Sequence, residues 1–235
     1  MTLVGVDGCR GGWLVAEADE GLHQVSFRLC RSFPEVLAPL DERSAVLCVD
    51  MPIGLVAGGP RRCDVEARAF LGRPRGSSVF PAPCRAALEG RDHRQASELN
   101  WHASGNRLTI QGYGILARIR EVDEHITADR QRWLREAHPE VGFALLSGGG
   151  RGLTYRKKTP LGEAERLATL PEPLGCIDVA ATRACVGASA VGRDDLLDAL
   201  ACLATAQRIV LGSARVFPAG PPQIDQRGLR MEIVA

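Results

Sequence analysis

The sequence has few aromatic residues and no long apolar run. Aromatic side chains make up 5% of its 235 residues, which argues against a stacking platform that reads single-stranded bases. No apolar run approaches the roughly 20 residues that a bilayer span needs, and the first residues lack a charged segment followed by an apolar one. We therefore expect no membrane segment and no targeting signal, with a cytoplasmic location as the default.

Paired cysteine motifs and a strong net charge are also missing. The eight cysteines form no CxxC pair and several lie in apolar runs, which predicts reduced, mostly buried thiols and no zinc site. The formal net charge is only +1, so binding to a polyanion would require a local basic patch. The length suits one large domain, alone or with an inserted subdomain.

Lysine occurs only as the neighbours Lys157 and Lys158, and every other basic residue is arginine. An ammonium group can approach a phosphate or a metal-bound ligand as a compact point charge. Both lysines are therefore candidates for substrate binding, although a solvated loop explains them equally well.

The first fifty residues predict a sheet in which two acids follow apolar runs. Residues 2–7, 12–19 and 22–30 read as an antiparallel meander, residues 32–40 as a helix with Ser32 at its N-cap, and residues 44–50 as a further strand. If the last strand is parallel to the first, Asp7 and Asp50 end at the same sheet edge, where α/β sheets bind ligands. Each acid alone could equally cap the turn that follows it.

Residues 55–130 predict a mostly helical insertion within a single domain spanning residues 1–235. Several helical patterns alternate with loops, and the proline-rich stretch SSVFPAPCR is unsuited to a central strand. The segment is rich in arginine, which fits either contact with a phosphate backbone or a solvated helix face.

The remaining chain predicts one strand and several helices that carry further acids. A fifth strand is expected around residues 133–137, and Glu140 follows Pro139 at the start of a helix, where a purely structural role is also easy to defend. Thr159 is expected to cap a helix with Pro160 at its first position. In the buried helix expected over residues 191–212, Asp195 and Asp198 lie three apart on one face, and Asp194 is expected at the N-cap.

Together these acids predict a metal site. Their hard oxygen ligands favour Mg²⁺ or Mn²⁺ over zinc, and no histidine pair has zinc-like spacing. Several carboxylates at one sheet edge are what a two-metal site needs to hydrolyse a phosphodiester. The candidate catalytic residues are Asp7, Asp50, Glu140, Asp195 and Asp198.

Other residues are weaker candidates. His138 fits a proton shuttle, but a histidine bonded to a backbone carbonyl is more common. Arg10 and Arg85 fit phosphate binding or a structural ion pair with one of the carboxylates. Cys84 lacks the surroundings of a nucleophile and Trp13 is expected in the core.

Eight stretches of the chain, taken in order, resemble the family of predicted RNase H-like nucleases, also called domain of unknown function 429. They are GVDGCRGGW, VDMPIGL, CDVEARAFLG, SSVFPAPCRAAL, IREVDE, HPEVGFALL, KKTPLGEAERL and DDLLDALACLATA. The closing DLLDALA also resembles the DxxDA turn of Holliday-junction resolvases, in which two acids of the last helix complete the metal site.

The resemblance implies an RNase H-like fold, a mixed five-stranded sheet with antiparallel first strands, flanked by helices. Asp7 would then bridge the metal ions, Asp50 would be the acid of the fourth strand, and Asp195 and Asp198 would be those of the last helix. Glu140 would be a further ligand or a base. The inserted helical segment departs from the compact resolvases, which leaves the type of nucleic acid open.

Two other function classes fit parts of the sequence. Actin-like ATPases and sugar kinases also begin with an aspartate and glycines on a hairpin, as in Asp7, Gly8, Gly11 and Gly12, but no second phosphate loop is recognisable. A non-catalytic RNase H-like scaffold that binds a partner is the other alternative. The oligomeric state stays open, with a dimer among the alternatives.

Overall fold

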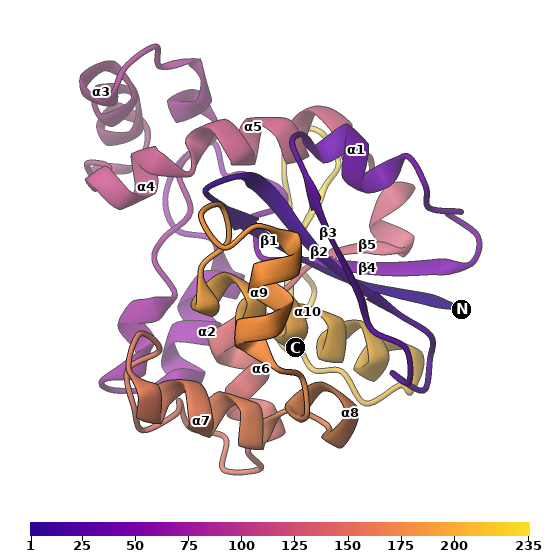
Figure 1. Ribbon diagram of the computed structural model, residues 1–235. Helices are drawn as coiled ribbons and strands as arrows, with labels where there is room; N and C mark the ends of the chain where they lie inside the picture. Colours follow the sequence, from indigo (N-terminus) through magenta and orange to yellow (C-terminus); the bar gives the residue numbers. More distant parts are fainter.

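A computed structural model describes all 235 residues, numbers 1–235, as a central sheet with helices on both faces (Figure 1). The strands of the sheet are β1 Thr2–Cys9, β2 Gly12–Ala18, β3 Ser26–Cys30, β4 Ala45–Val49 and β5 Leu134–Glu136. Their order is β3-β2-β1-β4-β5, with β1 antiparallel to β2, β2 antiparallel to β3, and β4 parallel to both β1 and β5. The structure confirms an α/β fold with a mixed five-stranded sheet.

Helices make up most of the remaining regular structure. The α-helices are α1 Phe33–Leu37, α2 Arg62–Leu71, α3 His93–Ser104, α4 Ile110–Gly114, α5 Leu116–His125, α6 Pro139–Leu146, α7 Pro160–Thr169, α8 Glu172–Gly175, α9 Val179–Val186 and α10 Arg193–Val210. Three short 3₁₀ helices are η1 Arg75–Ser78, η2 Arg85–Glu89 and η3 Arg130–Arg132.

The two faces of the sheet pack into separate apolar clusters because strand side chains alternate between them. Leu3 and Leu14 face the side of α10, whereas Val4 and Val15 face the side of α1 and α5. On the first side, α10 packs directly against β1: a Cβ on Gly5 would lie 2.1 Å from the Ala199 carbonyl oxygen. The lack of a side chain at Gly5 thus lets the helix approach the strand that carries Asp7.

The segment 55–130 is helical, as its sequence patterns indicate. Its first and last long helices, α2 and α5, contribute residues to the core, including Ala67 and Ile119. Only α3 and α4 project away from the sheet (Figure 1). The proline-rich stretch between η1 and η2 forms no strand.

Several predicted element ends differ from the structure. The third strand starts at Ser26 and not at residue 22, because Leu22 adopts a positive φ of 59° in the preceding turn. The last helix begins at Arg193 with Gly192 at its N-cap, so the prediction of Asp194 as N-cap is wrong. The N-cap at Thr159 is confirmed, since its side chain accepts a hydrogen bond from Gly162 N.

The C-terminal residues add strands that the sequence patterns did not indicate. They form two antiparallel pairs, β6 Val216–Phe217 with β9 Ile233–Val234, and β7 Gln223–Ile224 with β8 Arg230–Met231. A parallel bridge between Ala137 and Val234 places β9 beside the end of β5. The chain end therefore lies next to the edge at which Asp50 is found.

Two further sequence expectations concern cysteines and membrane spans. All eight cysteines are free thiols, six of them buried, in agreement with the expectation. None of the helices has the length and apolar character required to cross a bilayer.

Candidate functional site

Asp7 and Asp50 lie side by side on neighbouring parallel strands. Val6 of β1 lies opposite Val49 of β4, and Asp50 N donates a hydrogen bond to the Val6 carbonyl oxygen. Asp7 directly follows Val6 and Asp50 directly follows Val49, so both acids lie at the same edge of the sheet, as predicted. Asp7 does not end its strand, however, because the hairpin with β2 continues the pairing to Cys9.

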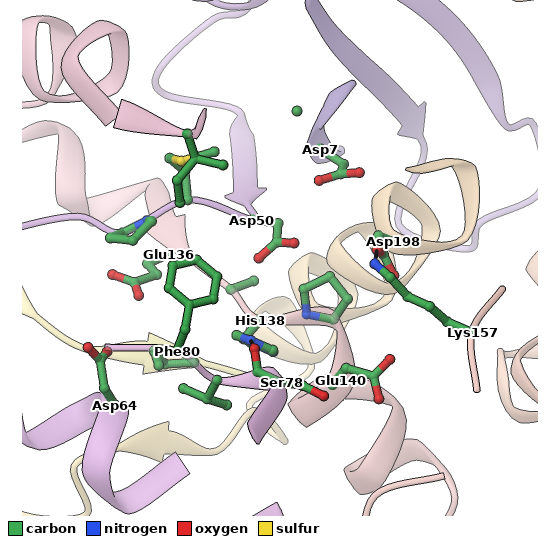
Figure 2. Close-up of a pocket in the computed structure, with 18 of the residues that line it drawn as sticks. Asp7, Asp50, Asp64, Ser78, Phe80, Glu136, His138, Glu140, Lys157 and Asp198 are labelled. Carbon is green, nitrogen blue, oxygen red and sulfur yellow. Dashed lines mark hydrogen bonds and ion pairs between the residues drawn. The ribbon is translucent and has the colours of Figure 1, made fainter. Parts of the chain in front are cut away.

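Asp198 joins these acids from α10, and a lysine contacts it. The Asp198 side chain is 5% exposed, and its Oδ2 lies 2.7 Å from Lys157 Nζ. The other oxygen, Oδ1, is buried and has no hydrogen-bond partner. In Figure 2 the carboxylates of Asp7 and Asp50 and the Lys157–Asp198 pair surround one open region. The single ammonium group therefore offsets only part of the negative charge of the three acids.

Burial and mutual repulsion weaken the acidity of the three carboxyl groups. Burial raises the pKa of Asp7 well above its ordinary value, and the charges of Asp50, Asp198 and Asp195 raise it further, while Lys157 lowers it. Burial also raises the pKa of Asp50 to about 7 and that of Asp198 to about 6, again against the effect of Lys157. Additional positive charge would be needed to hold all three groups ionised.

Glu140 lies at the start of α6, where a buried arginine binds it. Arg166 Nη2 of α7 donates to Glu140 Oε1, and the arginine is fully buried. Glu140 Oε2 is buried and has no partner. One oxygen of Glu140 is thus engaged in a structural ion pair and the other remains available.

His138 precedes α6 and lies close to the acids. Its Nε2 is 3.4 Å from the Ser78 carbonyl oxygen, and its buried Nδ1 has no partner. Burial lowers the pKa of His138, which favours the neutral ring. The backbone contact expected for a structural histidine is present, but it uses only one of the two ring nitrogens.

A single cavity of about 700 Å³ is lined by Asp7, Asp50, Asp198, Glu140, His138 and Lys157 (Figure 2). Its wall combines acids with basic side chains. The acids are Asp7, Asp50, Asp64, Glu136, Glu140 and Asp198, and the basic side chains are Arg75, Arg118, Arg156, Lys157 and Lys158. Four of the five predicted catalytic acids therefore come together here.

Asp195 is the exception. Its Oδ2 accepts a hydrogen bond from Gly192 N in a capping box at the start of α10, so that it satisfies a free backbone donor of the helix. Its side chain lines a second cavity of about 460 Å³, together with Arg10. Both residues lie outside the main cavity.

The remaining basic candidates differ in their surroundings. Arg85 makes a two-pronged contact with Asp123, at 2.8 and 3.1 Å, and also pairs with Asp225. Its partners are thus carboxylates remote from the acid cluster. Lys158 is 78% exposed and lies 3.5 Å from Asp194 Oδ2. Arg156 also lines the main cavity, is exposed and forms no side-chain hydrogen bond or ion pair.

Sequence reasoning missed a second acidic group in the cavity wall. Glu136, the last residue of β5, accepts hydrogen bonds from Ile53 N at 2.7 Å and from Arg61 Nη2 at 2.6 Å. Arg61 is fully buried and also lies 3.5 Å from Asp64. The signal for Glu136 was available, because an acid that ends a predicted strand is the same pattern that identified Asp50.

The oxygen donors suit a hard divalent cation, but their present positions do not enclose one. No three histidine, cysteine, aspartate or glutamate side chains form a group that could hold a metal ion as they stand. Asp198 Oδ1 and Glu140 Oε2, buried without partners, are the kind of oxygen that Mg²⁺ or Mn²⁺ binds. Asp198 would have to release Lys157 for both of its oxygens to be available to a metal ion.

Comparison with known proteins gives one match, which is to a family model. No curated protein and no solved structure matches the chain. A family model does match, over residues 5–223, and so includes Asp7, Asp50, Glu140 and Asp198. The chain therefore belongs to the family described as "Protein of unknown function (DUF429)".

Proposed function

We propose that the protein is a metal-dependent nuclease of RNase H-like fold, which hydrolyses phosphodiester bonds of nucleic acid. The strand order and directions support the fold, because β1 to β3 form the antiparallel meander and β4 and β5 are parallel to β1. This is the arrangement that the sequence resemblance implies.

The observation that carries the proposal is the convergence of Asp7, Asp50 and Asp198 on one cavity wall. Three separate elements, β1, β4 and α10, bring these carboxylates together although burial and repulsion oppose it. A cluster of like charges is unfavourable unless cations compensate it. Mg²⁺ or Mn²⁺ held by Asp7, Asp50 and Asp198 would offset the repulsion.

Bound divalent cations would supply an activated water and neutralise the charge that develops on a phosphodiester. The residues around them have separate roles in this proposal. Glu140, held by Arg166 through one oxygen, would serve as a ligand or base with its other, unpaired oxygen. His138, neutral and with Nδ1 unpaired, accepts a proton. Lys157, which contacts Asp198 in the absence of metal, would be available to a phosphate oxygen if cations took over that carboxylate.

Basic side chains support an anionic substrate. Arg156, Lys157 and Lys158 follow one another in the loop before α7, and all three line the cavity. Because the net charge of the chain is only +1, this short basic run supplies the local patch that binding to a polyanion requires.

A cleavage panel tests the proposal. Single-stranded DNA, duplex DNA, branched DNA and RNA are incubated with the wild type, Asp7→Asn and Asp129→Asn, in Mn²⁺ and in EDTA. Asp129 serves as the matched control because its side chain is 89% exposed. We expect the wild type and Asp129→Asn to cleave at least one substrate in the presence of Mn²⁺. In Asp7→Asn the cleavage rate should fall by at least about 100-fold, which is roughly the contribution of one catalytic group.

Other outcomes lead to the alternatives. Hydrolysis of ATP without cleavage of any nucleic acid would favour an actin-like phosphotransferase. Metal binding without turnover of any substrate would favour a non-catalytic RNase H-like scaffold.

A further inference from the structure

Phe80 is an exposed aromatic side chain in the wall of the acidic cavity. Six hydrophobic residues line this cavity, and four of them, Met51, Val79, Ala137 and Ile233, are no more than 5% exposed. Phe80 is 44% exposed, and in Figure 2 its ring points toward Asp50, with Glu136 and His138 on either side. Ile115 is half-buried, so Phe80 is the most exposed of the six hydrophobic side chains in the cavity wall.

The chain around Phe80 is fixed, so the ring cannot readily withdraw into the core. On one side, Arg68 Nη1 donates to the Val79 carbonyl oxygen. On the other side, Ala82 N donates to Asp64 Oδ2 at 3.0 Å and Cys84 N donates to Asn100 Oδ1 at 2.8 Å. Pro81 and Pro83 further restrict the backbone. The exposure of Phe80 is thus built into the segment.

A ligand of this cavity must satisfy two different surfaces. The acid cluster with its proposed cations suits a phosphate group. The basic run from Arg156 to Lys158 lines the same cavity. Phe80 favours a flat, partly apolar group, because stacking on the ring and burial of its exposed face are both favourable. A nucleotide with an unpaired base carries both groups within one unit.

The size of the cavity restricts the form of the nucleic acid. A volume of about 700 Å³ lies within the range of roughly 300–1,000 Å³ that is typical of small-ligand sites. Bases inside a duplex are stacked on one another and cannot insert into such a cavity to stack on a ring in its wall, whereas bases of a single strand can be splayed out.

We propose that Phe80 is the stacking platform for one unpaired base, so that the cavity takes a single-stranded segment with its phosphate at the acid cluster. This inference rests on the proposed nuclease function and specifies its substrate. The low aromatic content of the chain argues against an extended platform, but a single ring beside the acids is sufficient for one base.

Binding of defined oligonucleotides tests the inference. The probes are a fluorescent single-stranded 8-mer, the same strand with abasic sites at its central positions, and its duplex, measured by anisotropy in Ca²⁺. The proteins are the wild type, Phe80→Leu and Phe80→Trp. Phe80→Leu removes the ring and keeps an apolar side chain, and Phe80→Trp restores an aromatic surface. Thermal melting checks that each variant is folded.

We expect the wild type to bind the intact strand about tenfold more tightly than the abasic strand, because stacking on one aromatic ring supplies about this factor. Phe80→Leu should lose this preference without weaker binding of the abasic strand, and Phe80→Trp should keep it. The duplex should bind more weakly than the intact strand.

Two results would overturn the inference. An unchanged preference in Phe80→Leu, or equal binding of intact and abasic strands by the wild type, means that Phe80 does not hold a base. Cleavage of the abasic strand in Mn²⁺, followed on the same samples, keeps the two proposals apart. If one of these binding results is found but the abasic strand is cleaved, the nuclease function stands without the stacking role. If neither strand binds or is cleaved, both proposals fail.

Discussion

Lys157 Nζ lies 2.7 Å from Asp198 Oδ2, within the cluster of carboxylates that we propose to bind divalent cations. The ammonium group therefore supplies part of the positive charge that a bound metal ion would supply to these acids. Its own pKa is raised by Asp198, Asp50 and Asp7, although burial opposes this, so it stays charged at neutral pH.

Removal of this ammonium group should strengthen metal binding. In Lys157→Met no competing cation contacts Asp198, and we expect Mn²⁺ affinity to rise by about tenfold, or about 1.4 kcal/mol. Without metal, the same variant should melt at a lower temperature, because the acids lose their only close cation. Calorimetry and thermal melting with and without Mn²⁺ measure both effects. Unchanged or weaker Mn²⁺ binding would contradict the competition between lysine and metal.

Asp195 and Asp198 should respond differently to substitution. Asp195 belongs to the capping box of α10, so Asp195→Asn, which removes a negative charge from the first turn of the helix, should lower the free energy of unfolding by about 0.5 kcal/mol. Asp198 belongs to the cluster, and Asp198→Asn should weaken Mn²⁺ binding at least tenfold more than Asp195→Asn does. Equal losses of metal affinity in the two variants would mean that Asp195 is also a ligand.

The buried pair of Arg166 and Glu140 should be important for stability. Arg166→Met leaves the Glu140 carboxylate buried without its partner, which should lower the free energy of unfolding by about 3–5 kcal/mol. The double variant Arg166→Met/Glu140→Leu removes both charges and should be closer to the wild type. Urea denaturation distinguishes these cases. A double variant as unstable as Arg166→Met would show that packing around Arg166, not the charge, is responsible.

The stability of the metal-free protein should fall as the pH rises. Asp50 and Asp198 have raised pKa values of about 7 and about 6, so between about pH 4 and about pH 7 the folded chain holds protons that the unfolded chain has released. The free energy of unfolding in EDTA should therefore decrease through this window.

The Asp50→Asn variant isolates this effect from other titrating groups. His138 acts in the opposite direction, because its lowered pKa destabilises the fold at acidic pH in both proteins. We expect the decline of the variant to be shallower, by up to about 1 kcal/mol per pH unit. Parallel urea titrations at a series of pH values measure the difference, and identical slopes would mean that Asp50 is ionised throughout.

The sequence was most informative where a long regular pattern ends on a charged residue. Apolar runs before Asp7 and Asp50 predicted parallel strands with acids at one edge, and the helical spacing around Asp198 placed that acid on a buried helix. These patterns work because periodic burial determines which way side chains point.

Interactions between distant residues were not predictable in this way. Arg166 binds Glu140 from a separate helix, and Arg61 reaches Glu136 across 75 residues, so no local pattern shows either pair. The two-residue strands near the C-terminus are too short for alternation to appear. The start of α10 was misjudged because Gly192 caps the helix with help from the Asp195 side chain, in place of the expected Asp194.

Calorimetric titration of Mn²⁺ into the wild type, Asp7→Asn and Asp129→Asn tests the central claim most directly. We expect Mn²⁺ to bind to the wild type and to Asp129→Asn, and to bind to Asp7→Asn at least tenfold more weakly. Absence of Mn²⁺ binding to the wild type, even with single-stranded nucleic acid present, would contradict the metal-dependent mechanism.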